Sequence, residues 1–257
     1  MSQPRPQVLG VEITPGTHDD LLNQIRTHLS SGEGLLHVVT ANPEYVMSAR
    51  KDAEFAESIR EGGIVTVDGA GLAVAMKLLH PEITSERYTG VQLSMDCAQL
   101  SAETGKRLFL LGAGPGVAEE AARRLKADLP DANIVGTWSD GSPRAEHDAE
   151  TIQRIHEAKS EILLVAYGAP GQIYWIHRNF AALQEAGVQV VSGIGGALDY
   201  ISGNVKWAPP LVRKFGMEWL YRLVREPHRW RRQLVLPQFA VLMLAEFVQT
   251  KFRRGVE

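Results

Sequence analysis

Two short apolar runs in the first third of the chain end in polar residues that could take part in chemistry. The run LLHVVTA contains Thr40 and is followed by Asn42, and the run IVTVD ends with the carboxylate of Asp68. The glycines after Asp68 allow a ligand to approach the backbone, and the helix expected after them favours an anion at its N-terminus. Asp68 is therefore a candidate catalytic or ligand-binding acid, although Asp68 and Asn42 are also residue types that cap helices.

A glycine-rich segment, LLGAGPGVAEEAA, follows a third apolar run. Its pattern of strand, turn and helix presents backbone N–H groups to a phosphate or a nucleotide, and Gly112 and Gly114 would lie in the turn. The spacing lacks the third glycine of the dinucleotide fingerprint, but Asp140 after the next apolar run could bind a ribose as that fingerprint's acid does. An NAD(P)-dependent oxidoreductase is therefore one alternative.

Motifs that hold a metal are absent from the sequence. The chain has no H-E-x-x-H, no cluster of Cys and His, and no Asp-x-Asp pair of the kind that holds a metal against a nucleotide-sugar diphosphate. We therefore expect no metal and, outside the oxidoreductase alternative, no other cofactor. A bound diphosphate would then be neutralised by arginines and helix dipoles, because the guanidinium group offers a two-donor fork suited to phosphate.

Arginines of this kind are concentrated near the C-terminus. Residues 206 to 254 contain eleven Lys and Arg against three Glu, whereas residues 1 to 205 contain sixteen against twenty-six acidic residues. Tryptophan and leucine lie between the arginines of MEWLYRLVREPHRWRR, a combination typical of a helical segment at an anionic membrane surface. Four of these arginines could line one side of two short helices: Arg222, Arg225, Arg229 and Arg232.

The apolar run from Leu234 to Val248 is about fifteen residues long, which is too short to span a bilayer. It must be covered by the membrane, by the rest of the chain or by another copy, so a homo-oligomer stays open. The acidic body and the lack of a recognition motif predict no nucleic-acid partner. Because Cys97 is the single cysteine and no secretory signal is seen, we expect a cytoplasmic protein, peripheral on the inner face of the cell membrane.

Six apolar runs alternate with helical patterns and predict the sheet. They cover residues 35–41, 64–68, 107–113, 133–138, 162–169 and 188–197. Their nearly continuous Val, Ile and Leu indicate parallel strands covered on both faces. We expect an α/β fold: a Rossmann-like, mostly parallel sheet with helices on both faces, plus a small helical C-terminal appendage. We place the body at residues 1–207 and an appendage for diphosphate and membrane contact at residues 208–257.

Seven segments then occur in an order that matches one protein family. They are TANPEYV, VDGAGLAVA, ERYTG, LFLLGAGPGVAEEAA, GAPGQIYWI, GIGGALDYISGNVKWAP and FGMEWLYRLVREPHRWRR. Over nearly the whole chain, they resemble the WecG/TagA/CpsF group of bacterial N-acetylmannosamine transferases, glycosyltransferase family 26. The resemblance implies an inverting, metal-independent transfer of N-acetylmannosamine, or a related sugar, from a UDP-sugar to a polyprenyl-diphosphate-linked N-acetylglucosamine in cell-envelope polysaccharide or teichoic acid synthesis.

The resemblance also implies roles for individual residues. Asp68 looks like the proposed catalytic base, which takes a proton from the acceptor hydroxyl as that hydroxyl attacks the anomeric carbon. Thr40, Asn42 and Gln172 look like the polar residues around the sugars, and the tail arginines look like those that close over the site. Together with the strand ends and ERYTG, the expected substrate-binding residues are Arg87, Gly112, Gly114, Gln172, Gly195, Asp199, Arg222, Arg225, Arg229 and Arg232.

Four positions depart from the pattern of that family. Gly171 and Ile173 replace a lysine and a glutamate, Gln92 replaces an acid, and Trp207 replaces an arginine. Two cations and two acids are thereby lost near the expected site, so the identity of the donor sugar and of the acceptor stays open. A non-catalytic homologue that binds within an envelope-assembly complex is a further alternative.

Overall fold

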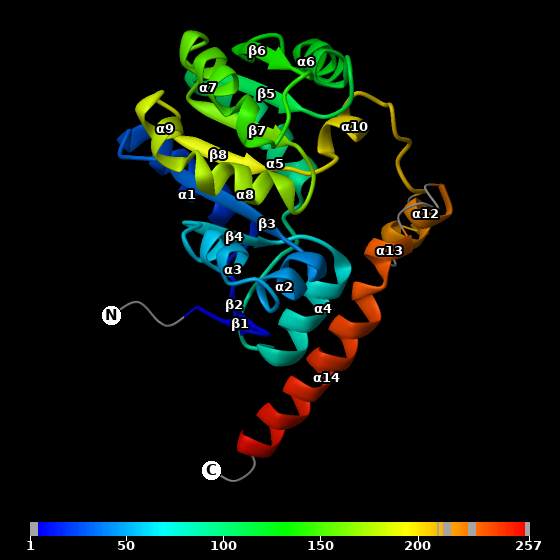
Figure 1. The fold of residues 1–257 in the computed structure, drawn as a ribbon. Coiled ribbons are helices and arrows are strands. Elements are labelled where there is room, and N and C mark those ends of the chain that lie inside the picture. Colours follow the sequence, from blue (N-terminus) through cyan, green and yellow to red (C-terminus); the bar gives the residue numbers. More distant parts are fainter. Residues whose placement is uncertain (1–4, 210, 213–216, 226–229, 255–257) are drawn as a thin grey trace.

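The structure, a computed structural model, describes residues 5–209, 211–212, 217–225 and 230–254. Its centre is a six-stranded parallel sheet in the order β4-β3-β8-β7-β5-β6 (Figure 1). The six predicted strands are all confirmed: β3 (Leu36–Ala41), β4 (Ile64–Val67), β5 (Leu108–Gly112), β6 (Ile134–Trp138), β7 (Ile162–Ala166) and β8 (Val190–Gly193).

Helices cover both faces of this sheet, as alternate strand residues point to opposite sides. One face, with Val38 and Leu110, packs against α1 (His18–Ser31), α5 (Gly90–Thr104), α6 (Val117–Asp128) and α10 (Ala197–Ile201). The other face, with Val39 and Leu111, packs against α2 (Pro43–Ala49), α3 (Ala53–Arg60), α7 (Asp148–Glu157), α8 (Gly171–Arg178) and α9 (Phe180–Glu185). The predicted Rossmann-like architecture is therefore confirmed.

Two helical patterns that read as continuous in the sequence are each divided in the structure. The pattern over residues 42–60 breaks before Asp52, whose side chain accepts a hydrogen bond from the N–H of Phe55 and caps α3. The pattern over residues 170–186 breaks at Asn179, whose side chain donates to the carbonyl of Trp175. Short polar side chains bond to the nearby backbone and so end helices that apolar periodicity alone would continue.

The remaining elements lie beside β4 and α2. A short hairpin of β1 (Gln7–Val8) and β2 (Val11–Glu12) precedes α1, and α4 (Ala70–Leu79) follows β4. The C-terminal appendage contains α12 (Glu218–Arg225), α13 (Trp230–Gln233) and α14 (Val235–Arg254). Figure 1 shows α14 running alongside α4 and α2, and Phe239 and Met243 are buried there. One side of the long apolar run is thus covered by the body of the same chain.

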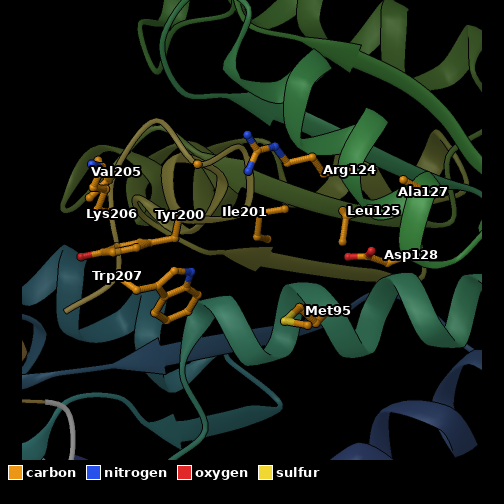
Figure 2. Close-up of a pocket in the computed structure, with 11 residues that line it drawn as sticks. Met95, Arg124, Leu125, Ala127, Asp128, Tyr200, Ile201, Val205, Lys206 and Trp207 are labelled. Carbon is orange, nitrogen blue, oxygen red and sulfur yellow. The ribbon is translucent and has the colours of Figure 1, made fainter. Parts of the chain in front are cut away.

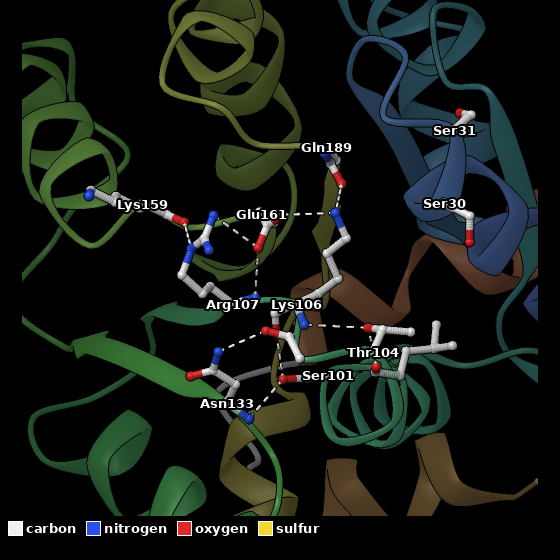
Figure 3. Close-up of polar contacts among 12 residues, drawn as sticks. Ser30, Ser31, Ser101, Thr104, Lys106, Arg107, Asn133, Lys159, Glu161 and Gln189 are labelled. Atoms are coloured by element: carbon white, nitrogen blue, oxygen red, sulfur yellow. Dashed lines mark hydrogen bonds and ion pairs between the residues drawn. The ribbon is translucent and has the colours of Figure 1, made fainter.

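A polar network fixes the amino-terminal ends of three strands (Figure 3). The Glu161 carboxylate accepts hydrogen bonds from the Lys106 ammonium at 2.9 Å and from the Arg107 backbone N–H at 3.1 Å. Lys106 also donates to the side chain of Gln189 at 3.0 Å. Because β5, β7 and β8 each begin one residue after Arg107, Glu161 and Gln189, the network aligns their starts. The carboxyl ends of the strands lie at the opposite edge.

Candidate active site

Asp68 lies directly after the edge strand β4, as the sequence predicts. Its backbone N–H donates to the carbonyl of Ala41 at the end of β3, at 2.6 Å. The N–H of Gly90, the first residue of α5, donates to Asp68 Oδ2 at 3.4 Å. A Cβ atom added to Gly90 would lie only 2.9 Å from the carbonyl oxygen of Ile194, which follows β8. The ends of β3, β4 and β8 therefore meet the start of α5 around this carboxylate.

Arg87 is placed near Asp68 by the segment that joins α4 to α5. This segment runs along the outer edge of β4, where Arg87 pairs with Val67 and the N–H of Tyr88 donates to the Val67 carbonyl at 2.9 Å. Arg87 Nη2 donates to Glu218 of α12 at 3.2 Å. Its Nε is buried and has no hydrogen-bond partner within the part of the chain that the structure describes. The site therefore holds a cation with an unused donor, as a phosphate site requires.

Burial raises the pKa of the half-buried Asp68 carboxyl from 3.8 to about 6. The loss of water around the carboxylate is the main cause, because it disfavours the charged form. The N–H of Gly90 and the guanidinium of Arg87 lower this pKa, while the carboxylate of Glu218 raises it further. Such a group is mostly ionised at neutral pH yet binds a proton readily, which suits a general base.

Thr40 and Asn42 lie at the end of β3 beside Asp68. The Thr40 side chain is buried, and its hydroxyl donates to the carbonyl of Gly193 on β8 at 3.1 Å. Asn42 caps α2, because its side-chain oxygen accepts a hydrogen bond from the N–H of Tyr45 at 3.1 Å. The helix-capping alternative is thus confirmed for Asn42. Contact of either residue with a sugar stays a prediction.

Gln172 is buried where α8 begins and joins three segments of the chain. Its Oε1 accepts hydrogen bonds from the N–H of Gly168 at 3.1 Å and of Gly195 at 2.9 Å, in the loops after β7 and β8. Its Nε2 donates to the hydroxyl of Tyr45 on α2 at 2.6 Å. Gln172 and Gly195 therefore shape the loops at the strand ends, a role that the sequence alone did not reveal.

The predicted phosphate-binding turn lies farther along the sheet. Gly112 ends β5 with φ of +89°, and a Cβ there would lie 2.7 Å from the ring of Tyr167, so only glycine fits. Gly114 follows in the turn, where its carbonyl accepts from the N–H of Val117. Four strand spacings of about 4.8 Å each, roughly 19 Å in all, separate the ends of β5 and β4. These glycines and Asp68 can therefore hold the two ends of one extended ligand.

Asp199 lies in α10, and its contacts are local. Its carboxylate accepts a hydrogen bond from the Asn204 side chain at 3.1 Å, and its carbonyl accepts from the N–H of Val205 at 2.9 Å. These bonds shape the turn that follows α10. A role for Asp199 in binding substrate stays a prediction.

A hollow of about 670 Å³ lies between α5, α6, α10 and the segment that follows α10 (Figure 2). Trp207 and Tyr200 contact each other at its rim, with ring centroids 5.0 Å apart, and Met95 and Arg124 lie on the facing helices. Asp68 is not among its lining residues. Trp207, one of the departures from the family pattern, thus lines this hollow.

Much of the arginine-rich tail cannot be placed at the site. Arg229 lies outside the described residues, and Arg222 and Arg232 belong to α12 and α13, but their side chains are outside the description. The guanidinium of Arg225 lies over the ring of Tyr221, 5.5 Å from its centroid. The described contact between α12 and the site is instead made by Glu218. Glu218 belongs to FGMEWLY, part of one of the segments that resemble the family, but no pattern in the sequence indicated a role for Glu218 itself.

Two other departures from the family pattern have structural explanations. Ile173 is fully buried in the core beside α2 and α3, so an apolar residue suits its position. The Gln92 amide donates to Asp96 at 3.1 Å, one turn along α5. Gly171 opens α8. Among the described residues, no group of three or more His, Cys, Asp or Glu is arranged to hold a metal ion.

Comparison with known proteins identifies the family. Residues 6–253 match the model of the Glycosyl transferase WecG/TagA/CpsF family. A protein of Bacillus spizizenii is 33% identical over 218 residues, which cover 85% of this chain and 82% of that protein. A protein of Bacillus subtilis is 31% identical over 209 residues, which cover 81% and 79%. Both are named N-acetylglucosaminyldiphosphoundecaprenol N-acetyl-beta-D-mannosaminyltransferase. The chain therefore belongs to the WecG/TagA/CpsF family of glycosyltransferases.

Proposed function

We propose that this protein is an inverting, metal-independent transferase. It moves N-acetylmannosamine, or a related sugar, from a UDP-sugar to a polyprenyl-diphosphate-linked N-acetylglucosamine. The family supplies the reaction class, and the names of the two relatives supply the sugar and the acceptor. The observation in this chain that carries the proposal is the Asp68 carboxyl, with its pKa raised to about 6, near Arg87 and the start of α5.

In this proposal Asp68 acts as the general base. It takes the proton of the attacking acceptor hydroxyl, whose oxygen forms a bond to the anomeric carbon as the bond from that carbon to the UDP oxygen breaks. Attack on the face opposite the leaving group inverts the anomeric centre. The electron pair of the broken bond leaves on the diphosphate, where the Arg87 guanidinium stabilises the added charge.

The spacing of the site suits an extended donor. The nucleotide end would lie toward Gly112 and Gly114 at the end of β5, and the sugar end toward Asp68. In this placement the donor spans the roughly 19 Å between the ends of β5 and β4. Gln172, buried between them, supports the loops that the donor would cross.

We further propose that the protein contacts the inner leaflet of the cytoplasmic membrane, where a lipid-linked acceptor would lie. The outward side of α14 exposes Val241, Leu244, Val248 and Phe252 by 67%, 53%, 48% and 73%. Their spacing of three, four and four residues places them in one stripe along the helix. Within the described ranges, no helix is long and apolar enough to cross a membrane. The stripe therefore favours contact with the membrane surface.

The test of the reaction is UDP release from UDP-N-acetylmannosamine in excess chelator, with and without a short-chain prenyl-diphosphate N-acetylglucosamine. We expect release that depends on the acceptor, survives the chelator and falls at least a hundredfold in Asp68→Asn. Asp52→Asn, which changes the acid that caps α3, should retain activity. The anomeric coupling of the product in NMR spectra tests inversion.

The alternatives predict different results in the same samples. Release that stops when divalent ions are removed would contradict the metal-free mechanism. An NAD(P)-dependent oxidoreductase would bind NADH and not UDP. A non-catalytic homologue would release no UDP with any donor in a panel of UDP-sugars.

A further inference from the structure

Two carboxylates of the appendage bond to the body of the chain at different places. Glu246 of α14 accepts a hydrogen bond from the N–H of Leu9 at 3.0 Å, beside the β1–β2 hairpin. Glu218 of α12 accepts from Arg87 Nη2 at 3.2 Å, next to the catalytic candidate Asp68. Both anchor an appendage helix, but only Glu218 does so through a residue of the proposed active site.

The ion pair of Glu218 with Arg87 is partly shielded from water. The two side chains are 34% and 31% exposed, so their attraction is screened less than that of a fully exposed pair. A carboxylate and a phosphate accept hydrogen bonds from a guanidinium in the same way. Without substrate, Glu218 therefore occupies the Nη2 group of Arg87, which a diphosphate would use. Arg87 Nε has no hydrogen-bond partner among the described residues.

The local charges oppose a state in which Glu218 and a diphosphate both contact Arg87. Two charged side chains of the described residues interact with Asp68: Arg87, which follows β4 in the chain, and Glu218 on α12. The adjacent groups of Asn42, Gly69 and Gly90 are uncharged. Among the described side chains, one cation thus already faces two carboxylates, and a diphosphate would add further negative charge. Like charges that share one partner at close range repel each other.

We propose that Glu218 is a positioning residue that holds α12 on Arg87 in the substrate-free protein and yields Arg87 to the diphosphate of the donor. The exchange frees α12 only when the donor is bound, and it links the state of the appendage to the occupancy of the site. This inference rests on the proposed function, because it takes the donor to be a nucleoside diphosphate sugar.

The first experiment measures UDP binding to the full chain by calorimetry. Glu218→Gln removes the competing charge, and Glu246→Gln is the matched control, since it changes an appendage carboxylate that also bonds to the body but lies beside Leu9. We expect UDP to bind about twofold to fivefold more tightly to Glu218→Gln than to the wild type. Glu246→Gln should bind UDP as the wild type does. Equal or weaker binding in Glu218→Gln overturns the competition.

The second experiment measures amide hydrogen exchange over residues 218–225. In the wild type, UDP should speed the exchange of this helix, and in Glu218→Gln the exchange should be fast without UDP. Glu246→Gln should leave it at the wild-type rate. Exchange that is unchanged by both UDP and Glu218→Gln overturns the docking role. If no variant binds UDP, the proposed donor is wrong, but exchange in Glu218→Gln still decides whether Glu218 holds α12.

A pH profile of kcat/KM separates this role from a purely structural one. The carboxylate of Glu218 raises the pKa of Asp68, so its removal should lower that pKa. The acidic limb of the profile should therefore move to lower pH in Glu218→Gln and stay in place in Glu246→Gln. A variant that only loosened the appendage would reduce the rate at all pH values without moving this limb, and that result would contradict the proposal.

Discussion

Replacing Asp68 by Asn should make the folded protein more stable at pH 7 while it removes transfer. The pKa of Asp68 is raised from 3.8 to about 6, so the folded state binds a proton more tightly than the unfolded state between these values. The free energy of unfolding therefore falls as the pH rises from about 4 to about 6, and it stays lower above that range. Asn carries no charge and can still accept the hydrogen bond from Gly90.

The size of the stabilisation in Asp68→Asn follows from the pKa shift of Asp68. About 2 pKa units correspond to about 3 kcal/mol of unfavourable interaction with the charged form. Because Asp68 is only half-buried, solvent screens part of this cost, and we expect a gain of about 1–2 kcal/mol at pH 7. Below about pH 4 the wild-type carboxyl is protonated in the folded state, so the difference between the two proteins should nearly vanish.

Urea unfolding of the wild type and Asp68→Asn at pH 4 and pH 7 measures this difference in the free energy of unfolding. Asp52→Asn serves as a control of opposite sign. The hydroxyl of Tyr174 and the N–H of Phe55 lower the pKa of Asp52, so its charge stabilises the fold above the unfolded pKa and this stability is lost in acid. Asp52→Asn should therefore be less stable than the wild type at pH 7. A less stable Asp68→Asn at pH 7, or a gain of equal size at pH 4, would refute the desolvation argument.

Three further predictions use other parts of the fold. Gly90→Ala should cost about 1–3 kcal/mol in urea unfolding and lower UDP release, because its Cβ would press on the carbonyl of Ile194; wild-type stability would contradict this close packing. Glu161→Gln should cost about 1–3 kcal/mol but leave kcat/KM unchanged, since its ion pairs lie at the opposite edge of the sheet from Asp68. Phe252→Ser should weaken binding to anionic liposomes about tenfold in a flotation assay without altering unfolding, and an unchanged flotation would argue against the exposed stripe as the contact surface.

Features that depend on neighbours in the sequence were predictable. The apolar runs locate all six strands of the sheet, and the residue after the second run is the acid at the site. The cap at Asn42 follows from its position before Pro43. Each of these features is set by a repeat, a cap or a turn within a few residues.

The division into a body at residues 1–207 and an appendage at residues 208–257 stays a prediction. The appendage is helical, as expected, but its last helix packs on α2 and α4 through Phe239 and Met243. From the sequence, this helix could be covered by the membrane, by the rest of the chain or by another copy. In the fold, the body covers one side of the helix, and we propose that the membrane covers the other side.

The arrangement within the site was decided by contacts between distant parts of the chain. The hydrogen bond of Gln172 with Tyr45 joins residues 127 positions apart, and the ion pair of Arg87 with Glu218 joins residues 131 apart. Such pairs depend on the strand order β4-β3-β8-β7-β5-β6. In this order β8 lies beside β3, although β8 is the last strand along the chain. Local periodicity marks each strand but carries no information about its neighbour. The sequence by itself therefore indicated the candidate acid and, through the family motifs, the glycosyltransferase class, whereas only the tertiary structure assigned partners to Asp68, Arg87 and Gln172.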